Sequence, residues 1–319
     1  MLSGWIILDK PFGLGSTQAV SAVKRALREA GEPKTKVGHG GTLDPLASGV
    51  LPIALGEATK LAGRMLDATK AYDFTIRFGE QTSTLDAEGE VVATSDVRPT
   101  RAEVDAVLPR FTGAIEQVPP AYSALKVDGQ RAYALARAGE EVALKSRVVA
   151  IFDLTIRHPE LFSGSISPPV GSSPEWMLKQ VQHDGLEEIT LSATVSKGTY
   201  IRSLARDMAL ALGTVGHVTM LRRTKAGPFT LAQAISLDFL HEAAKARRLD
   251  GAVHPLVAGL DDIPALPVSP EEAVLLRQGR QLVRSPALAG LHLALDAGRP
   301  VALVEGSADG LRVVRGFNV

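Results

Sequence analysis

The segment of the chain with the clearest chemical potential is residues 38–49, GHGGTLDPLASG. It places Asp44 between a glycine-rich turn and a proline, with Leu43 and Leu46 nearby. A carboxylate held on a stiff loop beside apolar side chains is fixed and partly desolvated, which suits a nucleophile or a general base. The same aspartate could instead hydrogen-bond its own backbone in an ordinary turn. The segment alone favours the turn and leaves catalysis open.

Basic residues gather between positions 195 and 228, where Asp207 is the only acid. They are Lys197, Arg202, Arg206, Arg222, Arg223 and Lys225. The whole chain carries 35 basic and 35 acidic residues, and this neutrality argues against a nucleic-acid partner, because phosphate neutralisation supplies much of such affinity. A neutral chain can still present a basic face, so an RNA or DNA partner stays open. The alternative is that these residues are ordinary solvated charges.

Composition removes several other chemistries. The chain has no cysteine, which excludes disulfides, thiolate catalysis and cysteine-ligated zinc. His158, His183 and Asp184 could suggest a metal site, but they lie in or beside an expected insertion, and we expect no metal. Residues 1–9 lack a basic leader, and no apolar run is long enough to cross a bilayer. The sequence therefore predicts a cytoplasmic protein with no membrane partner.

Hydrophobic periodicity places the candidate groups on strands, helices and one loop. Residues 3–8 indicate a buried strand, and Ser16 is a candidate N-cap for a helix over residues 17–29. Residues 38–49 are too rich in glycine and proline for a regular element, so they predict a shaped loop.

Two strands follow from alternating apolar residues at 72–78 and 189–195. Tyr72 lies on the apolar face of the first, where simple core packing is the alternative to a functional role. Apolar residues recur at helical spacing over 201–212, and Gly213 could end that helix. Strands mixed with helices, without a regular βα repeat, predict an α+β fold.

Composition also divides the chain. Residues 159–185 are rich in Ser, Pro and Gly and predict a disordered insertion between two segments that would otherwise be neighbours, 151–157 and the strand near 189. A proline cluster near 250–267 marks a boundary between a domain of residues 1–250 and a small β-rich domain of residues 251–319. Apolar runs at 291–295, 301–304 and 311–314 supply its expected strands.

Residues 39–60 closely resemble the catalytic motif of the TruB family of tRNA pseudouridine synthases. Four more segments resemble motifs of that family in the same order, and the resemblance runs from about residue 4 to residue 230. They are LDKP at 8–11, KAY at 70–72, VPPAYSALK at 118–126 and SKGTYIRSL at 196–204. The resemblance implies a mixed β-sheet catalytic domain with flanking helices and a small C-terminal PUA-like domain.

The resemblance also implies roles for individual residues. Asp44 matches the catalytic aspartate and Tyr72 the tyrosine that stacks on the target uracil. Arg202 matches the arginine that pairs with the aspartate, and Tyr200 lies two residues earlier in a segment expected to be strand-like.

Three further residues match the family's nucleotide site. Leu221 matches an apolar residue of the pocket wall, and His39 matches a histidine that helps to hold the nucleotide out of its stack. Lys10 matches the lysine of the opening motif, with a structural or an RNA-facing role.

The implied reaction is the isomerisation of uridine to pseudouridine at position 55 in the T arm of tRNA. The uridine must be flipped into a pocket, where an ionised carboxylate acts on it. The step is neither redox nor hydrolysis, so no cofactor is expected. Residues 119–147 resemble an RNA-gripping thumb, which implies that the enzyme acts without a guide RNA. A monomer is the simpler expectation for an enzyme that wraps one tRNA arm. The alternatives are a non-catalytic tRNA-binding or tRNA-folding protein, and a hydrolase for which no Ser-His or metal constellation is present.

Overall fold

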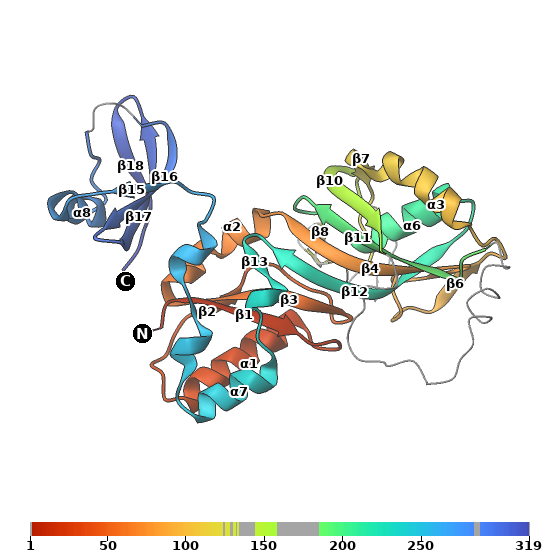
Figure 1. Ribbon diagram of the computed structural model, residues 1–319, viewed down its shortest axis with the longest axis horizontal. Helices are drawn as coiled ribbons and strands as arrows, with labels where there is room; N and C mark the ends of the chain where they lie inside the picture. Colours follow the sequence, from red (N-terminus) through yellow and green to blue (C-terminus); the bar gives the residue numbers. More distant parts are fainter. Residues whose placement is uncertain are drawn as a thin grey trace, which may run out of the picture. The chain divides into compact units, whose positions relative to one another are not determined.

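The computed structural model describes residues 2–123, 125–127, 130–131, 133, 144–157, 185–283 and 288–318. Its contacts divide the chain into two compact units (Figure 1). Unit 1 is discontinuous and combines Met1–Ala68 with Lys225–Val319, whereas unit 2 is the single stretch Thr69–Thr224.

Unit 1 begins with the antiparallel strands that carry the Asp44 loop. Strand β1 pairs with β3 along its whole length, and β3 also pairs with the short β2. Helices α1 and α7 pack against each other beside these strands (Figure 1). The first part of unit 1 contains β1 (Gly4–Lys10), α1 (Ser16–Glu29), β2 (Val37–His39), β3 (Ala47–Leu55), η1 (Gly56–Leu61) and α2 (Ala62–Asp67).

The second part of unit 1 completes its core. Trp5 of β1 packs on Phe229, with ring centroids 5.4 Å apart, and its indole N–H donates to the carbonyl of Leu256 at 3.1 Å. Strand β14 pairs with the first two residues of β1, Gly4 and Trp5, so the start of β1 is held by a segment from late in the chain. This part contains β13 (Phe229–Thr230), η5 (Leu231–Gln233), α7 (Leu237–Lys245), η6 (Leu249–Ala252), β14 (His254–Pro255) and η7 (Leu256–Gly259).

A small sheet closes unit 1, in the order β15-β16-β17-β18. Phe317, just beyond β18, is buried in the same hydrophobic cluster as Trp5, and the backbone N–H of Asn318 donates to Glu57 at 2.8 Å. The elements are β15 (Ala265–Pro267), α8 (Pro270–Arg277), β16 (Gly290–Asp296), β17 (Arg299–Ser307) and β18 (Gly310–Gly316). The predicted small C-terminal β domain is confirmed, while its boundary at residue 251 stays a prediction.

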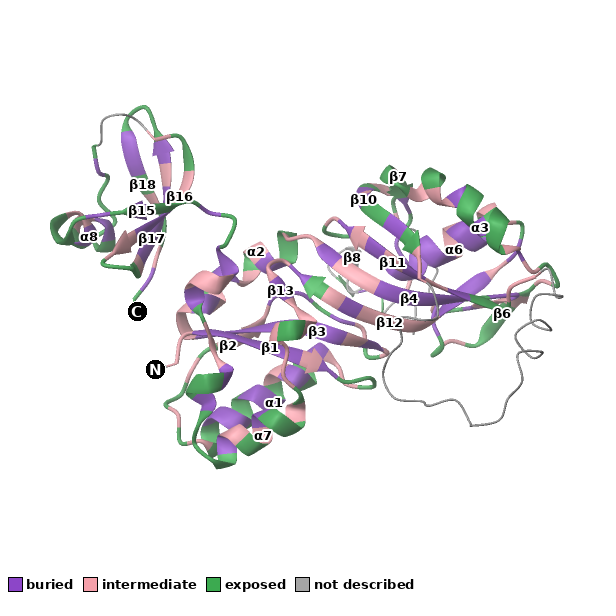
Figure 2. Ribbon diagram, in the orientation of Figure 1, coloured by how far each residue is buried: buried purple, intermediate pink, exposed green. Residues whose placement is uncertain are grey.

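Unit 2 is built on strands in the order β12-β4-β11-β10-β7. Apolar residues of the strands, of α3 and of α6 form one buried cluster (Figure 2). The elements are β4 (Lys70–Phe78), β5 (Glu80–Thr82), β6 (Val91–Thr94), α3 (Arg101–Val107), η2 (Leu108–Phe111), β7 (Gly113–Gln117), β8 (Lys126–Val127), β9 (Gln130–Arg131), β10 (Arg147–Ile156), β11 (Glu188–Val195), α6 (Ile201–Ala211) and β12 (Gly216–Ala226). The predicted α+β class is confirmed.

Most predicted elements are present, and two predictions near Asp44 are wrong. Ser16 is not the N-cap of α1 but its first residue, because Gly15 takes the cap position and the Ser16 hydroxyl is bonded elsewhere. The loop predicted over 38–49 is shorter, because β2 extends to His39 and β3 begins at Ala47. Pairing with β1 and β3 stabilises these ends in strand geometry despite their glycines.

The insertion predicted at residues 159–185 lies outside the described residues, apart from Gly185. The strands on either side of it, β10 and β11, pair as antiparallel neighbours, as their sequences predicted.

Candidate active site

Asp44 is half-buried on the loop between β2 and β3, and the backbone on both sides of it is hydrogen-bonded. On the N-terminal side, the Ser16 hydroxyl donates to the Leu43 carbonyl at 2.9 Å and accepts from the Leu43 N–H at 2.8 Å. On the C-terminal side, the Pro45 carbonyl accepts from the Gly13 N–H at 2.9 Å. The carbonyl of Asp44 itself accepts from the Ala47 N–H at 3.0 Å. The carboxylate is therefore carried on a loop with a defined path.

Two glycines of the loop are required by its geometry. Gly41 has a φ of +132°, a conformation that residues with a side chain rarely adopt. A Cβ added at Gly40 would lie 2.6 Å from the Cβ of Met65. The glycine-rich composition thus serves a close approach and a backbone conformation.

Lys10 and His39 lie beside this loop in unit 1. Lys10 is fully buried, and its ammonium group donates to the carbonyls of Pro11, Leu14 and Pro45 at 3.0, 2.6 and 3.2 Å. Of the two roles expected for Lys10, structural or RNA-facing, these contacts fit the structural one. His39 ends β2, and its Nδ1 accepts from the Gly41 N–H at 3.3 Å, so the ring is oriented by the loop.

Tyr72 and Leu221 belong to unit 2, on β4 and β12. Both are partly buried and pack on the hydrophobic cluster of that unit. Tyr72 lies on β4 opposite Ala193 of β11, on the face it shares with Phe74. Tyr72 is half-buried, so it is not a fully enclosed core tyrosine.

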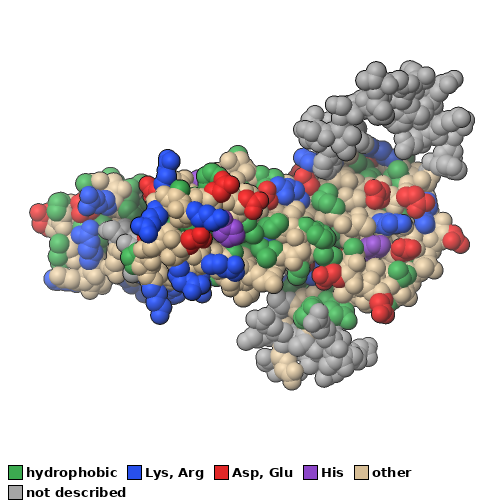
Figure 3. Space-filling model, turned by 90° about the horizontal axis from the view of Figure 1, so that it is seen from below, with side chains coloured by type: hydrophobic (Ala, Val, Ile, Leu, Met, Phe, Trp, Pro, Cys, Tyr) green, Lys and Arg blue, Asp and Glu red, His purple; other side chains and the backbone are tan. Residues whose placement is uncertain are grey.

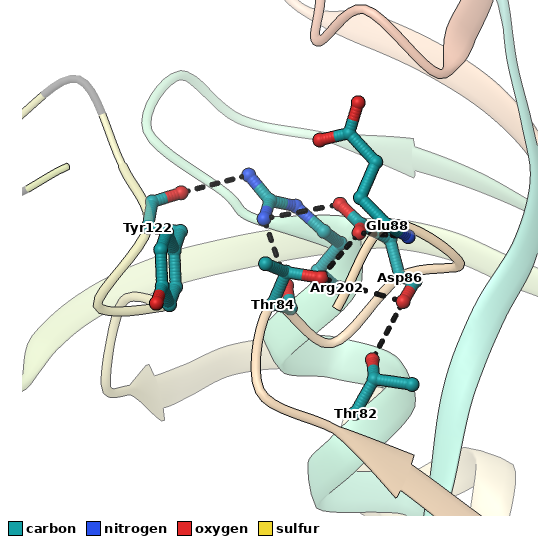
Figure 4. Close-up of polar contacts among 6 residues, drawn as sticks. All are labelled: Thr82, Thr84, Asp86, Glu88, Tyr122 and Arg202. Carbon is teal, nitrogen blue, oxygen red and sulfur yellow. Dashed lines mark hydrogen bonds and ion pairs between the residues drawn. The ribbon is translucent and has the colours of Figure 1, made fainter. Parts of the chain in front are cut away.

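Arg202 is the second residue of α6, and its side chain is 6% exposed. Its guanidinium donates to the carbonyls of Thr84 and Tyr122 at 2.8 and 3.0 Å (Figure 4). It also forms an ion pair with Asp86 at 3.3 Å. The alternative that Arg202 is a solvated helix residue is therefore wrong.

Asp86 was not singled out from the sequence. It lies in the turn between β5 and β6, where its carboxylate accepts from the Thr84 hydroxyl and from the Glu88 N–H (Figure 4). The preceding Leu85 has a φ of +62°, which is strained for a residue with a side chain. Strained turns of this kind often hold a functional group in place. Here the group is the carboxylate that faces Arg202.

Tyr200 is the N-cap residue of α6, so the expectation of a strand-like segment is wrong. The buried Gln117 side chain accepts from its N–H at 2.8 Å and donates to its carbonyl at 3.1 Å. The guanidinium of Arg147 lies over its ring, 4.8 Å from the centroid. Tyr200 is therefore held at its backbone and at its ring by residues that sequence reasoning did not connect with it.

The basic segment at 195–228 is not a uniformly solvated face, since Arg202 and Arg223 are both buried. Lys197 and Lys225 of that segment are exposed, and further exposed basic residues occur on α1 and at the end of α7, where Figure 3 shows Lys and Arg side chains gathered. They include Lys24, Arg25, Arg28, Lys245, Arg247 and Arg248.

Within the described part of the chain, no three His, Asp or Glu side chains group as metal ligands. His158, His183 and Asp184 lie outside it. None of the described helices has the length and apolarity to cross a membrane.

Comparison with known proteins finds relatives that match this chain along its whole length. Residues 24–170 match the TruB family pseudouridylate synthase (N terminal domain), and residues 202–261 match the tRNA pseudouridylate synthase B C-terminal domain. A protein of Novosphingobium aromaticivorans named tRNA pseudouridine synthase B is 59% identical over 100% of this chain and 98% of its own length. A protein of the same name from Zymomonas mobilis is 56% identical over 99% of this chain and 96% of its own length.

Among solved structures, a Cbf5-Nop10-Gar1 complex contains a chain that is 25% identical, with a TM-score of 0.68 over 99% of this chain and 85% of that one. The chain belongs to the TruB family of pseudouridine synthases.

Proposed function

We propose that this protein is an isomerase that converts uridine to pseudouridine in tRNA, at position 55 of the T arm, with Asp44 as the catalytic carboxylate. The observation that carries the proposal is the full-length similarity to relatives named tRNA pseudouridine synthase B. The fixed path of the loop around Asp44 supports it, because a catalytic carboxylate must be held in place before the substrate arrives.

The reaction breaks the N1–C1′ bond of the uridine and forms a C5–C1′ bond. The proton on C5 is lost and N1 gains one, so no electrons are gained or lost overall. These atoms are hidden in folded RNA, and the nucleotide must leave its stack to react. Asp44 acts on the flipped nucleotide, at C1′, at C6 or at the C2′ proton, and each of these roles needs the ionised carboxylate.

Other residues are proposed to hold the flipped nucleotide. The half-buried Tyr72 would offer its ring as a stacking surface worth about 1–3 kcal/mol per base, and Leu221, which packs on the same cluster, would offer an apolar wall. His39, Tyr200 and Arg202 complete the proposed substrate-binding set, and Lys10 supports it from beneath the Asp44 loop. Because the step is neither redox nor hydrolysis, the proposal includes no cofactor or metal.

The protein is proposed to act as a cytoplasmic monomer without a guide RNA. Residues 119–147 would grip the T stem-loop, with Tyr122 and Tyr133 among them. The two rings meet edge to face, with centroids 5.8 Å apart, and Tyr133 is exposed. Exposed aromatic rings beside basic residues suit contact with unpaired bases and phosphates together.

The test is to incubate the protein with an unmodified tRNA transcript and to measure pseudouridine in the T loop. Asp44→Asn should form none while still binding the tRNA. A matched control is Asp105→Asn, since Asp105 is an exposed residue of α3 that pairs only loosely with Arg101, at 3.6 Å.

Wild type that binds tRNA but makes no pseudouridine would instead support a tRNA-binding or tRNA-folding protein. Full activity of Asp44→Asn would contradict the role of this carboxylate.

A further inference from the structure

We propose that Ser16 is a positioning residue for the reaction, and that its hydroxyl fixes the backbone that carries Asp44. The inference rests on the proposed function, and it adds to that function a residue outside the proposed substrate-binding set. The part of unit 1 that carries it is the junction between the first turn of α1 and the Asp44 loop.

The Ser16 hydroxyl makes a two-way bond to a single residue. It donates to the Leu43 carbonyl at 2.9 Å and accepts from the Leu43 N–H at 2.8 Å, so one side chain satisfies both backbone polar groups of Leu43. Ser16 is 5% exposed and Leu43 is 4% exposed, so water cannot easily replace the hydroxyl.

The hydroxyl is not needed by its own helix. A serine at a helix start usually caps the free backbone N–H groups, but Ser16 lies one residue inside α1. At the cap position, the Gly15 N–H donates to the side-chain oxygen of Gln18 at 2.8 Å. The Ser16 side chain therefore contributes to the loop rather than to the helix end.

Leu43 needs this support because its loop has no regular secondary structure to hold it. Between His39 and Ala47 the chain forms neither helix nor strand, and Gly40 and Gly41 precede Thr42. Glycine gives the backbone conformational freedom, and contacts with other elements must restrict that freedom if the loop is to position a catalytic group. Ser16 can restrict it, because α1 is anchored by a buried face that includes Ala19, Val23 and Ala26. Sites held by rigid elements keep their geometry better than free loops.

Separate hydrogen bonds hold the backbone on the two sides of Asp44. Leu43 is fixed by Ser16, and Pro45 is fixed by the Lys10 ammonium and the Gly13 N–H. Lys10 ends β1, Ser16 begins α1, and Gly13 lies in the connection between them. Without the Ser16 hydroxyl, the Pro45 side would stay fixed while the Leu43 side could move, which would tilt the carboxylate.

The test compares Ser16→Ala with Ser16→Thr and with the matched control Ser21→Ala. Ser21 lies on the same helix, is exposed, and donates its hydroxyl only to the Thr17 carbonyl at 3.0 Å. The measurements are the single-turnover rate of pseudouridine formation at saturating enzyme and, separately, the Kd for tRNA.

Ser16→Ala is expected to lower the single-turnover rate by about 10- to 100-fold, because small displacements of a catalytic group cost rates of that order. The Kd for tRNA should stay within about threefold, and Ser21→Ala should match wild type, as surface substitutions usually do. Ser16→Thr retains the hydroxyl and should recover most of the rate. A wild-type rate for Ser16→Ala, or an equal loss of rate and binding, would overturn the proposal.

A second measurement needs no variant. The Leu43 amide should exchange with deuterium far more slowly than an unstructured amide in the wild-type protein, and fast exchange there would also overturn the proposal. Failure of the proposed function is separate, because it would be seen as a wild-type protein that makes no pseudouridine or as full activity of Asp44→Asn, whatever Ser16→Ala does.

Discussion

Replacing Asp86 by asparagine removes the carboxylate that faces Arg202 while keeping the shape of the side chain. The asparagine carbonyl can still accept from the Thr84 hydroxyl and the Glu88 N–H, so the turn between β5 and β6 is expected to persist. Its amide group would then turn two hydrogen-bond donors toward a guanidinium that is itself a donor. The substitution thus perturbs the ion pair and little else.

The size of the effect follows from distance and burial. At 3.3 Å and an effective dielectric constant of about 20, the attraction between the two charges is about 5 kcal/mol. Removing one partner of a buried pair usually costs about 3–5 kcal/mol. Arg202 keeps its bonds to the carbonyls of Thr84 and Tyr122, so we expect the lower end, about 3 kcal/mol of unfolding free energy.

The assay is urea denaturation followed by circular dichroism, together with the single-turnover rate. The rate should fall by about 100-fold if the guanidinium is displaced from its proposed position beside the substrate. Asp73→Asn is the matched control, because Asp73 has the same side-chain exposure as Asp86 and pairs with Arg157 at 2.7 Å. Arg157 is 34% exposed against 6% for Arg202, so water replaces the lost charge and the cost should be about 0–1 kcal/mol.

Equal losses of stability in Asp86→Asn and Asp73→Asn would refute the reasoning, since burial of the arginine would then have no influence. An unchanged rate in a folded Asp86→Asn protein would show that Arg202 does not depend on this ion pair for its position.

Three further predictions concern other parts of the chain. Gln117→Leu removes both side-chain bonds to the Tyr200 backbone and should cost about 1–3 kcal/mol in urea denaturation, with slower modification; unchanged stability would contradict it. Gly40→Ala places a Cβ 2.6 Å from the Met65 Cβ and should lower thermal stability and rate together, a result checked by calorimetry and the same assay. Burial raises the pKa of Glu57, but hydrogen bonds from Lys60 and the Asn318 N–H outweigh it and leave the pKa below its ordinary value. Glu57 therefore stabilises the fold above its unfolded pKa, and this contribution should be lost as the pH falls below about 4; Glu57→Gln should flatten that part of the profile of Tm against pH.

Local patterns in the sequence predicted the elements well where apolar residues repeat. The alternation in β4 and β11 and the helical spacing in α6 reflect contacts with a single buried cluster, so each element carries its own signal. The Asp44 loop was located by composition, but its ends were not, because strand pairing with β1 and β3 overrides the preference of glycine for loops.

The partners of the site residues could not be predicted, because they come from distant parts of the chain. Thr199, Tyr200 and Ile201 are all typical of strands, and the N-cap residue of the helix that begins there makes no side-chain capping hydrogen bond. The N–H of Tyr200 is satisfied by Gln117 from another strand. Likewise, nothing near Asp86 in the sequence indicates that a guanidinium on α6 will meet it.

The discontinuity of unit 1 has a consequence for the order in which the protein can fold during synthesis. Unit 2 is one continuous stretch, whereas the core around Trp5 needs Phe229, Leu256 and Phe317. At about 5–20 residues per second, roughly 10 to 50 seconds separate the synthesis of β3 from that of Phe317. During that interval β1 and β3 can pair, but their apolar side chains lack their final cover. We therefore expect the nascent segment that carries the Asp44 loop to expose apolar surface until Phe317 is made, and to need protection from aggregation during that interval.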